Sequence, residues 1–172
     1  TAEANARISG TLTDSSAGSV AISGSADGDG NFSITIVDAS GLADGTLNLS
    51  ITATDAAGNV SAAATKTATK DTAAPTITAA TLSSNSGTAK VSDVITITLT
   101  AGGSQSDLTI GDACTVNSVD VSGSFTYSTG GTYTITYTVT NGNADWISGG
   151  LPISCVLKEP AGNLVTVSSF TG

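Results

Sequence analysis

Residues 54–77 read TDAAGNVSAAATKTATKDTAAPTI, and this stretch closes one repeat of the chain and opens the next. Its first part, DAAGNV at 55–60, recurs near the C-terminus as EPAGNL at 159–164. Both copies place an acidic residue before A-G-N and an aliphatic residue after it, which defines an internal repeat. Because Gly and Asn adopt left-handed backbone at low cost, each A-G-N is predicted to be the turn of a β-hairpin.

The second part of the stretch, KDTAAP at 70–75, is predicted to be a linker. Pro75 fixes its own φ and holds Ala74 in an extended conformation, so the linker is expected to be short and stiff. We therefore predict one domain at 1–70, a linker at 71–75 and a second domain at 76–172, within the size range of single domains.

The composition favours β-structure. Hydrophobic residues make up 39% of the chain but aromatic residues only 4%, so the cores are aliphatic, and abundant Thr suits strands. The net charge of −9, without a Lys or Arg cluster, argues against nucleic acid as a partner. No apolar run approaches the roughly 20 residues that span a bilayer, so no membrane insertion is expected.

The first domain is predicted to contain strands of period two, as in the fourth, where Leu47, Leu49 and Ile51 share one face. An immunoglobulin-type sandwich needs about seven strands, and five are found here. Only 58 residues precede Asn59, whereas nearly 90 separate Pro75 from the second A-G-N. We expect the missing strands to come from upstream chain or from another copy by β-strand addition. The five predicted strands are 6–13, 18–25, 31–37, 46–54 and 60–69.

The second domain is predicted to hold the complete set of seven strands. The turn at 129–131 joins two strands in a hairpin, whose second arm places Tyr133, Ile135 and Tyr137 on one face. The predicted strands are 76–82, 91–100, 107–116, 122–128, 132–140, 151–158 and 164–170.

Four segments resemble tandem bacterial immunoglobulin-like repeats of large extracellular adhesins and surface fibres. They are TAEANARISG at 1–10, TDAAGNVS at 54–61, DTAAPTIT at 71–78 and AKVSDVITITLTA at 89–101. The resemblance implies two tandem immunoglobulin-like β-sandwiches, the first incomplete, in an extracellular or cell-surface protein. It also implies that calcium rigidifies the junction between repeats through Asp55, Asn59 and Asp71. The alternative is that Asp55 and Asn59 hydrogen-bond their own turn without metal.

A second calcium hypothesis concerns the turn SADGDGN at 25–31. Asp27, Asp29 and Asn31 alternate there and Asp38 stands at the twelfth place, as in an EF-hand loop. Phe32 occupies the position that needs Gly, so a plain solvated turn is the alternative.

Two cysteines, Cys114 and Cys155, share parity with aliphatic neighbours and are predicted to point into the core of the second domain. In an extracellular protein they are expected to form a disulfide, and the alternative is two buried free thiols. The chain has no His, which removes Ser-His-Asp and Cys-His catalysis and the commonest nitrogen ligand of zinc. We predict that the protein is not an enzyme.

Surface features leave two functions open. The sequons at Asn31, Asn48 and Asn59 are expected to face outward and become glycan sites only in an N-glycosylating organism. The first hypothesis is a non-catalytic structural subunit of a fibre, filament or long adhesin, whose partners are other copies of itself. The alternative is an adhesin module in which the loops near Trp146 bind a glycan or surface protein. Trp146 and the tyrosine row would then form a sugar-stacking platform, and the alternative for the tyrosine row is that it belongs to the core.

Overall fold

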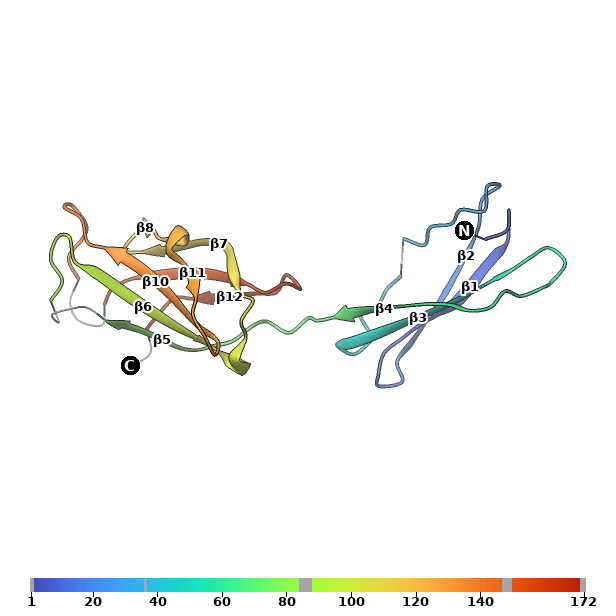
Figure 1. The fold of residues 1–172 in the computed structure, drawn as a ribbon, viewed down its shortest axis with the longest axis horizontal. Helices are drawn as coiled ribbons and strands as arrows, with labels where there is room; N and C mark the ends of the chain where they lie inside the picture. The colour runs from blue at the N-terminus through green and yellow to red at the C-terminus, as the bar shows by residue number, and fades with distance from the viewer. Residues whose placement is uncertain (1, 36, 84–87, 147–149, 171–172) are drawn as a thin grey trace. The chain divides into compact units, whose positions relative to one another are not determined.

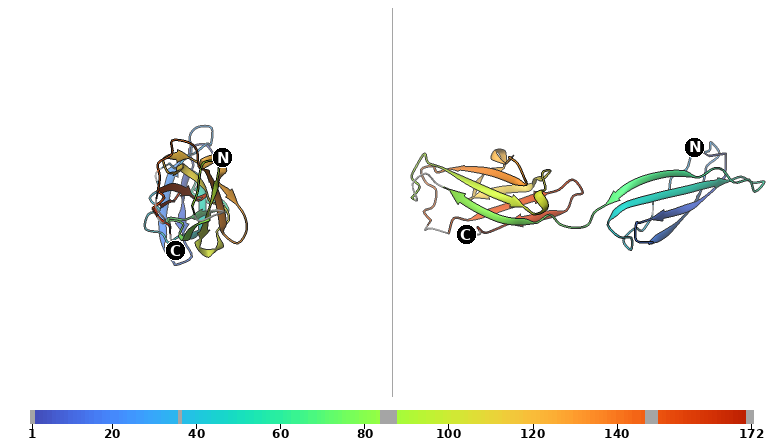
Figure 2. Two further views of the ribbon diagram at one scale, coloured as in Figure 1. Left: turned by 90° about the vertical axis from the view of Figure 1, so that its left-hand side faces the viewer. Right: turned by 60° about the horizontal axis from the view of Figure 1, so that its bottom comes forward.

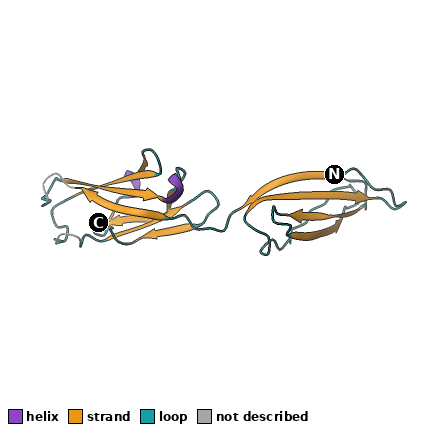
Figure 3. Ribbon diagram, turned by 90° about the horizontal axis from the view of Figure 1, so that it is seen from below, coloured by secondary structure: helices purple, strands orange, loops and turns teal. Residues whose placement is uncertain are grey.

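The computed structural model describes residues 2–35, 37–83, 88–146 and 150–170. The chain divides into two compact units, Thr1–Thr72 and Ala73–Gly172, and this division falls inside the predicted linker. Regular structure is almost entirely β-strand (Figures 1 and 3), so the all-β prediction is confirmed. Among the described residues, no helix is long and apolar enough to cross a membrane.

Unit 1 contains one antiparallel sheet in the order β2-β1-β3-β4. Leu12 of β1 lies between Val20 of β2 and Leu49 of β3, so the apolar positions of neighbouring strands share one face. The strand predicted at 60–69 starts later, after a single bridge between Thr54 and Val60. The strands are β1 (Arg7–Thr13), β2 (Ser19–Ser25), β3 (Gly45–Thr54) and β4 (Ala64–Lys70).

The strand predicted at 31–37 is absent from the described residues of this segment, and that prediction was wrong. The connection from β2 to β3 leaves the sheet and returns to it as loop (Figure 1, light blue). Ile34 is half-buried between the exposed Ser33 and Thr35, but Phe32, which lies on the same side as Ile34, is exposed. A strand, however, also needs a ladder partner, and residues 32–35 make no backbone hydrogen bond to another described residue.

Unit 2 is a sandwich of two four-stranded antiparallel sheets, visible as two layers in Figure 2. One sheet has the order β5-β6-β10-β9 and the other β12-β11-β7-β8. Their inner faces form one core of fully buried side chains that includes Ile97, Leu99, Tyr133, Ile135 and Leu157. The strands are β5 (Ile77–Ser83), β6 (Val94–Ala101), β7 (Thr109–Val116), β8 (Val119–Asp120), β9 (Thr126–Tyr127), β10 (Thr132–Thr138), β11 (Ile153–Lys158) and β12 (Leu164–Val167).

Most strands predicted in this unit are confirmed within a few residues at their ends, with three differences. The region 122–128 holds a short 3-10 helix, η2 (Ser122–Ser124), and only two strand residues in β9. The start predicted at 91 is a turn, because the Asp93 carboxylate accepts the Lys90 amide at 2.9 Å. The two-residue strand β8 was not predicted, nor was the 3-10 helix η1 (Gly102–Ser104).

One sheet of unit 2 repeats the topology of the unit 1 sheet. In unit 1 the hairpin β1–β2 lies beside β3, which is joined to β4 through the A-G-N turn at 57–59. In unit 2 the hairpin β7–β8 lies beside β11, which is joined to β12 through the A-G-N turn at 161–163. The sequence repeat is therefore also a structural repeat, and β2-β1-β3-β4 corresponds to β8-β7-β11-β12.

Candidate functional site

The apolar face of the unit 1 sheet is buried unevenly. Ile8 and Ile22, on the β1–β2 side, are 1% and 7% exposed, whereas Leu49 and Ile51 of β3 are only half-buried. On β4 every residue except Lys70 is exposed, including those that lie opposite Leu49 and Ile51. Cover is therefore partial on β1, β2 and β3, since Leu12 and Val20 are half-buried like Leu49 and Ile51, whereas Leu47 of β3 is buried, and aliphatic surface remains in water.

The cover over β1 and β2 comes from the segment that joins β2 to β3. A Cβ placed on Gly24 would lie 3.2 Å from Cγ1 of Ile34, so this glycine gives the isoleucine room on the apolar face. Ala26 and Leu42, near the two ends of the segment, are buried. One extended segment therefore takes the place that a second sheet fills in unit 2.

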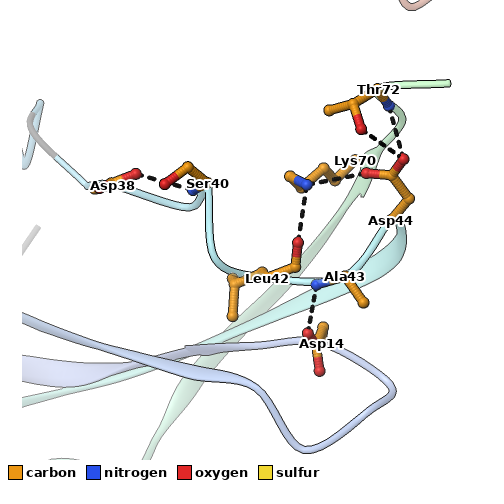
Figure 4. A network of polar contacts seen from close by, with 8 residues as sticks. All are labelled: Asp14, Asp38, Ser40, Leu42, Ala43, Asp44, Lys70 and Thr72. Atoms are coloured by element: carbon orange, nitrogen blue, oxygen red, sulfur yellow. Dashed lines mark hydrogen bonds and ion pairs between the residues drawn. The ribbon is translucent and has the colours of Figure 1, made fainter. Parts of the chain in front are cut away.

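Carboxylates fix the C-terminal end of this segment (Figure 4). The Asp14 carboxylate accepts the amide of Ala43 at 2.6 Å, which lowers the pKa of Asp14. Asp44 accepts the backbone amide of Thr72 at 2.9 Å, its hydroxyl at 2.8 Å and the ammonium group of Lys70 at 2.9 Å. These donors, the Thr72 amide first, lower the pKa of Asp44 to about 2.

The turn at 25–31 fixes the other end without requiring metal. The Asp27 carboxylate accepts the amides of Asp29 and Asn31 at 2.9 and 2.8 Å. Asp38, the residue at the twelfth place of the compared calcium loop, accepts the Ser40 amide at 2.9 Å instead. The described residues contain no group of three or more acidic, Cys or His side chains arranged to hold a metal ion.

The residues suggested for calcium at a repeat junction do not come together within this chain. Asp55 lies in the turn between β3 and β4, whereas Asp71 follows the far end of β4. Since β3 has ten residues, the two carboxylates lie roughly 30 Å apart. The Asp55 carboxylate accepts the backbone and side-chain amides of Asn59 at 2.8 and 2.7 Å, which lowers its pKa. These bonds match the alternative in which the turn is held by its own side chains.

The second A-G-N turn has the same construction. Gly58 and Gly162 both have left-handed backbone, with φ of 92° and 100°. Each glycine donates its amide to the carbonyl of the acidic residue three positions before it, Asp55 or Glu159, at 3.1 and 2.9 Å. Glu159 differs from Asp55 in being buried, and Gln105 donates to its second oxygen at 3.1 Å.

The two cysteines are joined by a disulfide in the core of unit 2. Cys114 of β7 and Cys155 of β11 lie directly opposite each other in adjacent strands of one sheet. Both are fully buried. The predicted bond and its inward orientation are therefore present.

Trp146 is half exposed, with 50% of its surface accessible, and its indole N–H donates to the side-chain oxygen of Asn117. Asn117 is buried and donates to the hydroxyl of Tyr137 at 3.1 Å and to the carbonyl of Ala144 at 3.0 Å. The Tyr137 hydroxyl donates in turn to Asn143 at 2.8 Å. This network was not predicted. The sequence feature that could have indicated it is Asn117-Ser118, a two-residue hairpin turn with positive φ between Val116 and Val119.

The tyrosine row does not form a sugar platform, because Tyr133 and Tyr137 are 0% and 2% exposed and belong to the core. Of the loop at 144–153 that carries Trp146, residues 147–149 lie outside the described residues. The sequon residues Asn31, Asn48 and Asn59 are all exposed.

Comparison with known proteins gives a match to a family model and matches to solved structures. A search of curated proteins finds no match. Among solved structures, the chain is similar to a tetra-tandem repeat in the extending region of a large adhesion protein, with 24% identity and a TM-score of 0.38. That similarity covers 98% of this chain and 42% of the other, so this chain spans about two fifths of its length. The family model described as bacterial Ig domain matches residues 1–70 of this chain.

Proposed function

We propose that the protein is a non-catalytic structural repeat of an extracellular fibre or long adhesin, in which unit 1 is completed by a strand that residues 1–172 do not supply. The single observation that carries the proposal is the unit 1 sheet with its partly covered apolar face. Leu49 and Ile51 remain half-buried, and the facing positions of β4 are exposed. Since wet aliphatic surface and an unpaired strand segment both cost free energy, an added strand would stabilise the unit.

Several features support a mechanical rather than a chemical role. The A-G-N turns close on themselves through their acidic and Asn side chains. The disulfide fits an oxidising, extracellular environment. Hydroxyl side chains cover the outer strand faces, as in β6 and β10, where Thr96, Thr98 and Thr100 lie opposite three threonines. Repeats built in this way transmit force through their ladders and need no bound ligand.

Native mass spectrometry and amide hydrogen exchange of the full chain test this proposal. We expect amides of unit 1 to exchange much faster than those of unit 2 in a chain that lacks the added strand. A soluble monomer in which the amides of β1 and β3 are as protected as those of β6 and β10 would overturn the proposal, because unit 1 would then need no added strand.

The half-exposed Trp146 favours one alternative, an adhesin module that binds a glycan or surface protein. Its indole is held by a buried Asn117, so the ring is fixed in orientation while one side stays in water. A glycan array with the full chain and with Trp146→Ala separates the two functions. A spacer binds nothing in either form, whereas a binding module loses its signal on substitution.

A further inference from the structure

The segment 30–35 of unit 1 has a counterpart in unit 2. Residues 30–35 read GNFSIT and residues 131–136 read GTYTIT. Both follow the hairpin that begins the shared topology, β1–β2 or β7–β8, and both precede the strand that enters the A-G-N turn. In unit 2 this segment forms the strand β10, which pairs with β6.

The backbone before each segment is also the same. Gly30 and Gly131 both have a φ of 78°. The amide of Ala2 donates to the Gly30 carbonyl at 2.7 Å, and the amide of Ala101 donates to the Gly131 carbonyl at 2.8 Å. A Cβ on Gly30 would lie 2.1 Å from the carbonyl oxygen of Ala2, and a Cβ on Gly131 would lie 3.2 Å from the carbonyl oxygen of Ala101. Ala2 therefore occupies the place of Ala101, the last residue of β6.

The two segments differ in what pairs with them. In unit 2, Tyr133 and Ile135 lie opposite Leu99 and Ile97 of β6, and both are 0% exposed. In unit 1, the corresponding Phe32 is 36% exposed and Ile34 is only half-buried. The backbone of 32–35 makes no hydrogen bond to another described residue. The donors and acceptors that β10 uses toward β6 are thus available in unit 1.

We propose that the backbone edge of residues 32–35 is the docking site of one β-strand that runs antiparallel to it and continues into residue 1. The inference rests on the proposed function and names the edge and the chemistry of the strand. The incoming strand alternates aliphatic with Thr or Ser residues, as β6 does. Its aliphatic side chains bury Phe32 and cover Leu49 and Ile51, and its hydroxyl side chains face water.

Two observations favour a strand continuous with residue 1 over a free strand from a second copy. The hydrogen bond from Ala2 to Gly30 places the N-terminal end of the chain where β6 ends in unit 2. The connection from β6 to β7 in unit 2 covers residues 102–108, and residues 3–6 make the corresponding connection to β1. A strand that leads into residue 1 therefore lies along the open edge without a further loop.

The test grafts the sequence of residues 90–99, KVSDVITITL, directly before residue 1 of the full chain, so that Thr1 takes the place of Thr100. Amide hydrogen exchange is then measured at residues 32–35. We expect their exchange to slow at least tenfold relative to the unmodified chain. The matched control exchanges the aliphatic and threonine positions of ITITL, which turns the apolar face outward, and should leave exchange at 32–35 unchanged.

No protection in the graft, or equal protection in graft and control, would overturn the inference. Protection of 32–35 in ungrafted assemblies would also overturn it, since the strand would then come from a second copy. A different result would contradict the proposed function, namely an unmodified monomer in which the amides of β1 and β3 exchange as slowly as those of β6 and β10. If the graft does not slow exchange at residues 32–35 but the chain still assembles, the docking site is wrong and the proposed structural role stands.

Discussion

Reduction of the disulfide between Cys114 and Cys155 should destabilise unit 2 selectively. The two residues are 41 positions apart, and on the chain-entropy model opening a loop of that size costs about 4 kcal/mol of unfolding free energy. For a unit of about 100 residues this corresponds to a melting temperature lower by roughly 20 °C. Unit 1 contains neither cysteine and should not respond.

Trp146 makes the assay specific, because the only tryptophan of the chain lies in unit 2. The chain is unfolded in urea with and without reductant, refolded, and titrated again while tryptophan fluorescence is recorded. The double variant Cys114→Ala/Cys155→Ala serves as control, since reductant must leave its midpoint unchanged. If oxidised and reduced wild-type chains differed by less than about 1 kcal/mol, the disulfide would not restrict the unfolded state as reasoned here.

Three further predictions concern polar contacts. Asp44 has a folded-state pKa of about 2, below the usual 3.8, so its contribution to unit 1 is present above pH 4 and lost as pH falls toward 2; circular dichroism melts of Asp44→Asn should lack this pH dependence. Asn117→Ala should cost about 1–3 kcal/mol and shift the fluorescence of Trp146, because buried hydrogen bonds are lost; an unchanged spectrum would contradict the network. Tyr133→Phe should cost a similar amount in urea titrations, since its buried hydroxyl accepts the Leu108 amide at 3.0 Å, and a cost near zero would show that this amide finds another partner.

Period-two patterns predicted the sheet well where both ladder partners lie in the chain. The fourth predicted strand is β3, and its face with Leu47, Leu49 and Ile51 is the apolar face of the sheet. The pattern failed at 31–37 because alternation reports which side of a segment is buried and carries no information about what pairs with its backbone. The late start of β4 has a different cause, because Ala62 and Ala63 have low strand propensity.

Among the site residues too, features that depend on local alternation could be predicted, and contacts between distant segments could not. The inward parity of Cys114 and Cys155 could be read from the sequence, because it depends on local alternation alone. The contacts of Asp44 with Lys70 and Thr72 could not, since residues far apart in sequence meet only after the sheet has formed. Asp55 and Asp71, close in the sequence, lie at opposite ends of a hairpin for the same topological reason.

The position of the disulfide also determines how unit 2 responds to a pulling force on its ends. The covalent bond carries tension directly from β7 to β11, so the loop between the cysteines, which are 41 positions apart, bears no load after the sheets separate. At about 3.4 Å per extended residue, roughly 140 Å of chain is withheld from extension. The oxidised unit would therefore stop lengthening earlier under tension than the reduced unit.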